Sequence, residues 1–177
     1  MAAINNQCFP GRAEQLAVVP MTREDIERVT AIERESFPTV WRRDAYEREL
    51  LNVNARYLVA KLGDQVVGYA GMWAIMDEAH ITTLAVAADC RRRGIGERLL
   101  VALLEAAEDA GAKVVTLEVR ESNAVARRMY EKYGFEAVAY MRTYYHDTGE
   151  DAVVMWLNPL RLLSSPGPPN EAPGSGP

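Results

Sequence analysis

Two side chains in the second half of the chain, Glu118 and Tyr130, could exchange protons with a substrate. Glu118 stands in the apolar stretch 114–119, where partial desolvation favours the neutral carboxyl group and makes it a better base. Tyrosine is a weak acid with an ordinary pKa of about 10 and could protonate a thiolate, whose thiol has a pKa of about 8.5. Both residues also have purely structural interpretations. Glu118 shares a strand face with Arg120 and could pair with it, and Tyr130 could be a core aromatic residue.

A second chemical signal is the sequence Arg-Arg-Arg-Gly-Ile-Gly at 91–96, between a predicted strand and a predicted long helix. The start of a helix offers unpaired N–H groups and partial positive charge, and glycine lets the backbone approach an anion. The segment therefore predicts a phosphate or pyrophosphate site, although a solvated basic turn would look the same. It is not a P-loop, because Gly-Lys-Ser/Thr is absent. It is not a dinucleotide fingerprint either, because Leu99 stands where Gly or Ala is needed.

The periodicity of apolar residues predicts the elements that position these groups. Helices are expected from a cap at Thr22 to Pro38, then over 41–51, 95–110 and 123–133. Strands are expected over 16–19, 57–62, 66–75, 79–86, 114–119, 135–145 and 152–157. The resulting order, β-α-α-β-β-β-α-β-α-β-β, predicts a mixed α/β (α+β) domain around one sheet.

The composition fits one globular domain with a real core, because 49% of the 177 residues are apolar and 25% are charged. We expect this domain to span 16–160. Residues 1–15 show no clear period and predict a flexible tail. The Pro-, Gly- and Ser-rich stretch 161–177 cannot bury enough apolar surface to offset ordering, so it predicts a disordered tail.

Charge and cysteine usage narrow the class of protein. A net charge of −5 without a long basic run argues against direct binding of nucleic acid. The chain has neither an apolar run long enough to span a membrane nor a basic-then-apolar start, so we expect a cytoplasmic protein. Cys8 and Cys90 lack CxxC partners, so we expect two free thiols and no metal site.

Several motifs occur together in an order and spacing that resemble the GNAT acetyltransferase superfamily. They are Arg91 to Gly96, Leu117-Glu118-Val119-Arg120, Ser122-Asn123, and Tyr130 to Phe135. Others resemble one branch of that superfamily, the bacterial ribosomal-protein-alanine N-acetyltransferases. These are Ser36-Phe37-Pro38 before Trp41, Gly68 to Gly71, Asp77 to Ile81, and Arg142 to Tyr145 followed by Glu150-Asp151-Ala152. The resemblance covers roughly 17–158.

The resemblance implies acetyl-CoA as co-substrate and no metal. It implies a mixed, mostly antiparallel sheet that splays between the strands ending near Val86 and Val119, flanked by helices. It assigns cofactor contacts to Leu84, Ala85, Val86, Arg92, Arg93, Gly94, Ile95, Gly96, Glu97, Asn123 and Tyr130. Glu118 would be the general base and Tyr130 the general acid.

The same resemblance implies that substrate contacts come from Phe37, Trp41, Tyr144 and Tyr145. His80 shares a strand face with Glu78, and either could touch the substrate amine; a hydrogen-bonded structural histidine is the alternative. The expected partner is a protein N-terminus, in particular the N-terminal alanine of a ribosomal protein, with no direct contact to nucleic acid or membrane. The oligomeric state stays open.

An α-amine fits this chemistry, since its pKa of about 7.7–8.0 leaves roughly a tenth neutral at pH 7, far more than for a lysine amine. Two other functions share parts of the pattern. One is acetylation of a small amine, which would not need the tyrosine pair. The other is an acyl-CoA-binding module without catalysis, which would not need both Glu118 and Tyr130.

Overall fold

The computed structural model describes residues 15–39 and 41–160. The tails expected over 1–15 and 161–177 fall outside this part, apart from Gln15. Seven strands form one sheet in the order β1-β2-β3-β4-β5-β7-β6, and every neighbouring pair is antiparallel except β4 and β5. The strands are β1 (Leu16–Pro20), β2 (Ala55–Leu62), β3 (Gln65–Ile75), β4 (Glu78–Val86), β5 (Val114–Arg120), β6 (Glu136–Tyr145) and β7 (Glu150–Leu157). The predicted fold class is confirmed.

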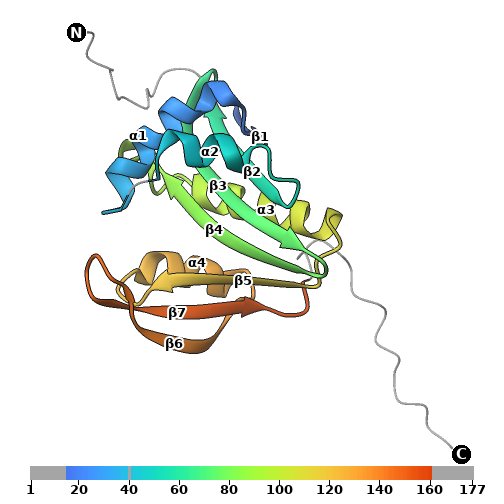
Figure 1. The fold of residues 1–177 in the computed structure, drawn as a ribbon, viewed down its shortest axis with the longest axis vertical. Helices are drawn as coiled ribbons and strands as arrows, with labels where there is room; N and C mark the ends of the chain where they lie inside the picture. Colours follow the sequence, from blue (N-terminus) through green and yellow to red (C-terminus); the bar gives the residue numbers. More distant parts are fainter. Residues whose placement is uncertain (1–14, 40, 161–177) are drawn as a thin grey trace, which may run out of the picture.

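Four α-helices flank the sheet at the places that the apolar periodicity predicts. They are α1 (Ile26–Ser36), α2 (Arg43–Glu49), α3 (Ile95–Asp109) and α4 (Ala124–Lys132), with short 3₁₀ turns at Arg23–Asp25 and Ala88–Cys90. The predicted cap at Thr22 is present, because the backbone N–H of Thr22 donates to the Asp25 carboxylate at 2.9 Å. In Figure 1, α1 and α2 cover one face of the β1–β4 half and α3 covers the other, while α4 lies beside β5.

The core lies between the sheet and the helices α1, α2 and α3. On α3, the side chains Leu99, Leu100, Leu103, Leu104 and Ala107 are buried, as their helical spacing predicts. Among the described residues no helix is long and apolar enough to cross a membrane.

Cys90 differs from the expectation of two free thiols. It is buried at the end of its 3₁₀ turn and is joined in a disulfide, so the expectation is wrong for this residue. Cys8 lies outside the described residues. Sequence spacing could not reveal the bond, because disulfides also join segments that only the folded chain brings together.

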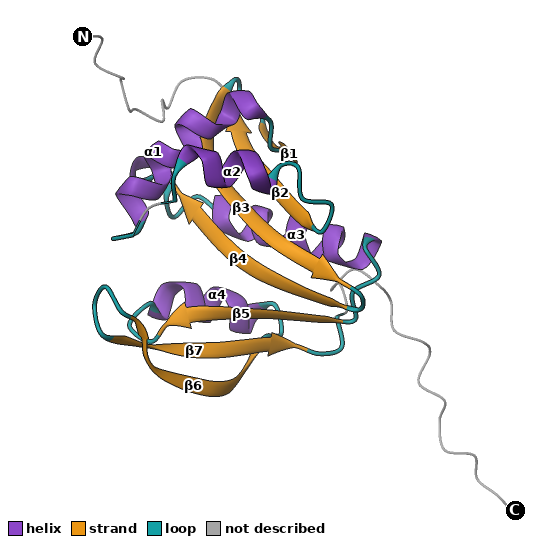
Figure 2. Ribbon diagram, in the orientation of Figure 1, coloured by secondary structure: helices purple, strands orange, loops and turns teal. Residues whose placement is uncertain are grey.

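The sheet divides where β4 leaves β5. These two strands pair only between Glu78–Ile81 and Val114–Leu117. Beyond that point β4 keeps only β3 as a partner, β5 keeps only β7, and the two halves diverge, as Figure 2 shows. A bulge accompanies the separation: Met72 pairs with Ile81 and Gly71 with Thr83, which leaves Thr82 without a partner in the ladder. Such a bulge bends its strand and increases its twist.

The bulge is supported by a close approach of Tyr57 to Gly71. Tyr57 is buried, and its hydroxyl lies 3.5 Å from the Thr82 hydroxyl. A β-carbon added at Gly71 would meet the Tyr57 ring, with Cδ1 and Cζ only 2.7 Å away. Glycine at this position therefore makes room for the ring that contacts the bulged residue.

We expect Gly71→Ala to destabilise the protein by about 1–3 kcal/mol, because the new methyl group must displace the Tyr57 ring. Urea denaturation measures the loss. In a Tyr57→Leu background the same substitution should have a much smaller effect, since the ring is gone. Equal losses in both backgrounds would contradict this account.

Candidate active site

Two adjoining cavities lie where the halves of the sheet diverge. One, of about 770 Å³, we call the arginine cavity; the other, of about 570 Å³, we call the tyrosine cavity. Both are lined by Ser36, Phe37, Leu84, Asn123 and Ala126, so they meet beside the end of β4 and the start of α4. Two ligands bound one in each cavity could therefore meet at this boundary.

The arginine cavity collects most of the residues predicted to hold a cofactor. They are Leu84, Ala85, Val86, Arg92, Gly94, Ile95, Gly96, Glu97 and Asn123. Arg93 is not among the residues lining either cavity. Sequence reasoning missed Ser36, Arg128, Met129 and Lys132, although Arg128 and Lys132 sit on the helix that carries Tyr130.

The backbone entering α3 has the geometry of an anion-binding turn. Arg92 has a φ of 61° and Gly94 a φ of 76°, and α3 begins immediately afterwards. A positive φ is unusual for arginine and persists only where the surroundings impose it. Arg91 fixes this turn, because its guanidinium donates to the Val86 carbonyl at 2.9 Å and to the Ser36 hydroxyl at 3.1 Å. The turn therefore presents backbone N–H groups and the charge of Arg92 together.

Glu97 lines the same cavity but is engaged in an ion pair. Lys132 Nζ lies 2.6 Å from its carboxylate, and the Tyr133 hydroxyl donates to it at 3.2 Å. The hydrogen bond from Lys132 is the main reason why the pKa of Glu97 lies below its usual value. This pair ties the first turn of α3 to the last turn of α4.

Glu118 lines the tyrosine cavity and contacts histidine rather than arginine. His80 Nε2 lies 3.2 Å from Glu118 Oε2, and His80 Nδ1 lies 2.8 Å from the Thr116 hydroxyl. His80 itself lines neither cavity. Arg120 is paired instead with Asp147 and Glu150. The structural alternative of a Glu118–Arg120 pair is therefore not formed, and the Glu118 carboxylate, with 22% of its side chain exposed, faces the cavity.

Tyr130 is both a buried aromatic residue and a wall of the tyrosine cavity. Its ring packs on Phe135 with centroids 5.6 Å apart, and only 7% of the residue is exposed. Burial, and secondarily Tyr145, raises the pKa of Tyr130 above its usual value, so the phenol keeps its proton at neutral pH. Within the described part of the chain its hydroxyl makes no hydrogen bond, and it is free to donate one to a ligand. Asn123 caps α4, accepting from Ala126 N–H at 3.2 Å.

Aromatic side chains from two segments line the tyrosine cavity. Phe37 and Trp41 come from the segment between α1 and α2, and Tyr144 and Tyr145 from the end of β6. The two tyrosine rings stand edge to face with centroids 5.1 Å apart. Burial raises the pKa of Tyr145 to about 12, and the nearby Glu118 contributes. Sequence reasoning did not identify Glu33, Arg120 or Asp147, which also line this cavity.

A buried polar chain borders the tyrosine cavity beneath α1 and α2. The Tyr46 hydroxyl donates to the Glu33 carboxylate at 2.8 Å and lies 3.2 Å from the Tyr69 hydroxyl, which accepts from Thr83 at 3.4 Å. Burial raises the pKa of Glu33 above its usual value, although the bond from Tyr46 opposes this effect. The chain links α1, α2 and β3 to β4 one residue beyond the bulge.

The arrangement suits transfer of an acyl group between two bound reactants. One cavity offers an anion-binding turn, and the other offers a carboxylate and a protonated phenol. No group of three or more His, Cys, Asp or Glu side chains that could hold a metal ion occurs in 15–39 and 41–160.

Comparison with known proteins agrees with this architecture. Residues 26–135 match the family described as Acetyltransferase (GNAT) family. A Bacillus subtilis (strain 168) protein, named provisionally as a ribosomal protein bS18-alanine N-acetyltransferase, is 39% identical over 142 residues, covering 80% of this chain and 94% of that protein. N-alpha-acetyltransferase RimI from Mycobacterium tuberculosis (strain ATCC 25618 / H37Rv) is 35% identical over 148 residues, covering 80% and 92%.

Solved structures give the same result. The crystal structure of the ribosomal-protein-S18-alanine N-acetyltransferase from Escherichia coli has a TM-score of 0.76 at 27% identity and covers 84% of this chain and 96% of that one. The family match spans most of the described residues, and the relatives are similar over nearly their whole length. The chain therefore belongs to the acetyltransferase (GNAT) family and is an acyl-CoA-dependent transferase.

Proposed function

We propose that this enzyme transfers the acetyl group of acetyl-CoA to the N-terminal α-amine of a protein, specifically the N-terminal alanine of a ribosomal protein in the cytoplasm. The observation that carries the proposal is the tyrosine cavity, where Glu118, Tyr130 and the Tyr144–Tyr145 pair face one space beside the arginine cavity. The names of the relatives support the same acceptor.

Acetyl-CoA would occupy the arginine cavity. Its pyrophosphate would bind Arg92 and the N–H groups of 94–97 at the start of α3. Its pantetheine arm would run along Leu84, Ala85 and Val86, where β4 no longer pairs with β5 and its backbone groups can accept a ligand. Asn123 lines both cavities and would contact the cofactor near their boundary.

The peptide would enter the tyrosine cavity with its amine toward Glu118. Glu118 takes a proton from the ammonium group, directly or through one water, and the neutral amine attacks the thioester carbonyl carbon. As the new C–N bond forms, the C–S bond breaks and Tyr130 donates its proton to the leaving sulfur. The nitrogen then loses its second proton, which restores the Tyr130 phenol, while Glu118 releases its proton to solvent. His80 holds the Glu118 carboxylate in place through its 3.2 Å contact rather than touching the amine. Positioning and proton transfer together account for the catalysis.

The assignment of Arg92 can be tested against its neighbour. Arg92→Ala should raise the Kd for acetyl-CoA roughly tenfold in calorimetric titration, because charge-assisted hydrogen bonds to the pyrophosphate are lost. Arg93→Ala is the matched control, since it removes the same charge from a residue that lines neither cavity. Equal weakening by both variants would mean that only the general positive charge matters.

The reaction can be tested with a panel of peptides and acetyl-CoA, with mass spectrometry locating the acetyl group. The panel contains an Ala-starting peptide, a Met-starting peptide and a peptide with a blocked N-terminus and internal lysines. We expect acetylation of the free α-amine, fastest on the Ala-starting peptide. Glu118→Gln and Tyr130→Phe should each lower kcat about 10²- to 10⁴-fold, because each removes one proton transfer.

Acetyl-CoA binding in both variants, measured by calorimetry, shows whether the fold is intact. Tight binding of acetyl-CoA without acetylation of any α-amine would contradict the proposal. Turnover of small amines in that case would identify a small-molecule acetyltransferase, and no turnover of any amine would identify an acyl-CoA-binding module.

A further inference from the structure

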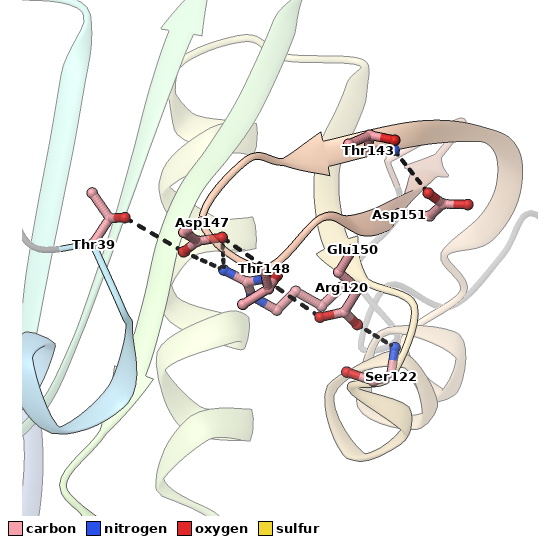
Figure 3. A network of polar contacts seen from close by, with 8 residues as sticks. All are labelled: Thr39, Arg120, Ser122, Thr143, Asp147, Thr148, Glu150 and Asp151. Carbon is pink, nitrogen blue, oxygen red and sulfur yellow. Dashed lines mark hydrogen bonds and ion pairs between the residues drawn. The ribbon is translucent and has the colours of Figure 1, made fainter.

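Arg120, the last residue of β5, is the centre of a polar network that sequence reasoning did not foresee. Only 19% of its side chain is exposed. Its Nη2 donates to both carboxylate oxygens of Asp147, at 2.9 and 3.1 Å, and its Nη1 donates to Thr148 Oγ1 at 2.6 Å and to Glu150 Oε2 at 3.4 Å (Figure 3). One guanidinium therefore holds both sides of the turn that joins β6 to β7.

The same guanidinium supports Tyr145. The Arg120 Cζ atom lies 3.9 Å from the centroid of the Tyr145 ring, a cation–π contact. Tyr144 packs edge-on against Tyr145, so the orientation of one ring limits the other. Arg120 consequently restricts the orientation of both tyrosine rings that line the tyrosine cavity.

The backbone just before the tyrosine pair is strained, and a residue other than Arg120 holds it. Thr143 has a φ of 52°, which is rare for a β-branched residue. Its N–H donates to the Asp151 carboxylate at 2.8 Å, and the pairing of β6 with β7 shifts register between Met141 and Tyr145. Strain of this kind persists only where surrounding contacts impose it and is common at functional sites. The backbone thus leaves regular pairing where the two tyrosines turn into the cavity.

The network also reaches the other walls of the site. Glu150 Oε1 accepts the Ser122 N–H at 2.8 Å, next to the cap of α4. The Thr39 hydroxyl donates to Asp147 at 3.4 Å, from the segment that carries Phe37 and Trp41. Hydrogen bonds with Arg120 hold the pKa of Asp147 below its usual value against the opposing effect of burial, so this carboxylate is ionised at neutral pH.

We propose that Arg120 is a positioning residue that preforms the peptide slot. It holds Tyr145 and the turn 146–149 in their binding geometry before the substrate arrives, and it touches neither the amine nor the cofactor. This inference rests on the proposed function. If these groups had to be ordered during binding, the conformational entropy lost would weaken the affinity for the peptide. The affinity for acetyl-CoA should not depend on Arg120, because Arg120 does not line the arginine cavity.

Hydrogen exchange and kinetics on three variants test the inference. Arg120→Gln removes the charge and the fork of donors, and Arg120→Lys keeps the charge but not the fork or the stacking geometry. Lys113→Gln is the control, because it removes an exposed ion pair with Asp77 at the opposite end of β5. Asp147→Asn weakens the same anchor from the surface turn and replaces Arg120→Gln if that variant does not fold.

For Arg120→Gln we expect faster exchange of the amides of 143–149, unchanged exchange in α3, a roughly tenfold higher KM for the peptide, and an unchanged KM for acetyl-CoA. For Arg120→Lys, the exchange of these amides and the peptide KM should lie between those of Arg120→Gln and the wild type. Lys113→Gln should match the wild type in both. Unchanged exchange in 143–149 would overturn the inference. So would a fall in kcat at constant peptide KM, which would place Arg120 in the reaction itself.

The two proposals fail in different ways. If the wild-type enzyme acetylates no peptide α-amine, the proposed function falls, while hydrogen exchange still decides whether Arg120 holds the turn. If peptides are acetylated and Arg120→Gln shows fast exchange without a rise in peptide KM, the proposed function stands and the positioning role falls.

Discussion

The short pairing between β4 and β5 is the constraint on which the rest of the site depends. Parallel strands inside a sheet normally satisfy each other's backbone groups along their whole length. Here the ladder stops at Ile81 and Leu117, and the bulge at Thr82 turns β4 away. The facing edges of both strands are left without a sheet partner in the middle of the fold. Because buried backbone groups require hydrogen bonds, this opening is stable only where a ligand or water can supply them.

One half of the divided sheet carries the anion-binding turn, and the other carries the side chains that could transfer protons. The β4 half carries the turn of arginines and glycines into α3, and the β5 half carries Glu118, Arg120 and, through α4, Tyr130. The two halves are held together at the narrow end by four paired residues on each strand and along the opening by side chains such as the Lys132–Glu97 pair. The groups that we propose to be catalytic thus lie on a strand and a helix, while the aromatic walls come from the segment between α1 and α2 and from the end of β6.

Local features of the site could be predicted from the sequence, and long-range pairings could not. The sequence pattern located the four α-helices and the seven strands, and on α3 the predicted apolar face is buried. The turn at 91–96 could be recognised because its arginines and glycines lie between a predicted strand and a predicted long helix. The partners of Glu118 and Arg120 were not visible, because His80 and Asp147 lie far away in the sequence and meet them only in the fold. The disulfide at Cys90 was missed for the same reason, and Arg93 could not be separated from Arg92 because backbone angles decide which of the two lines the cavity.

The charges lining the tyrosine cavity have a consequence for the direction of the reaction cycle. Three carboxyl groups, those of Glu33, Glu118 and Asp147, line it with a single guanidinium, that of Arg120. The α-amine that we propose as acceptor arrives mainly as a cation, whereas the amide that it becomes carries no charge. The negative potential that attracts the cationic acceptor therefore does not attract the neutral acetylated product. Neutralisation of the ligand would weaken its own binding, which favours release and limits inhibition by accumulated product.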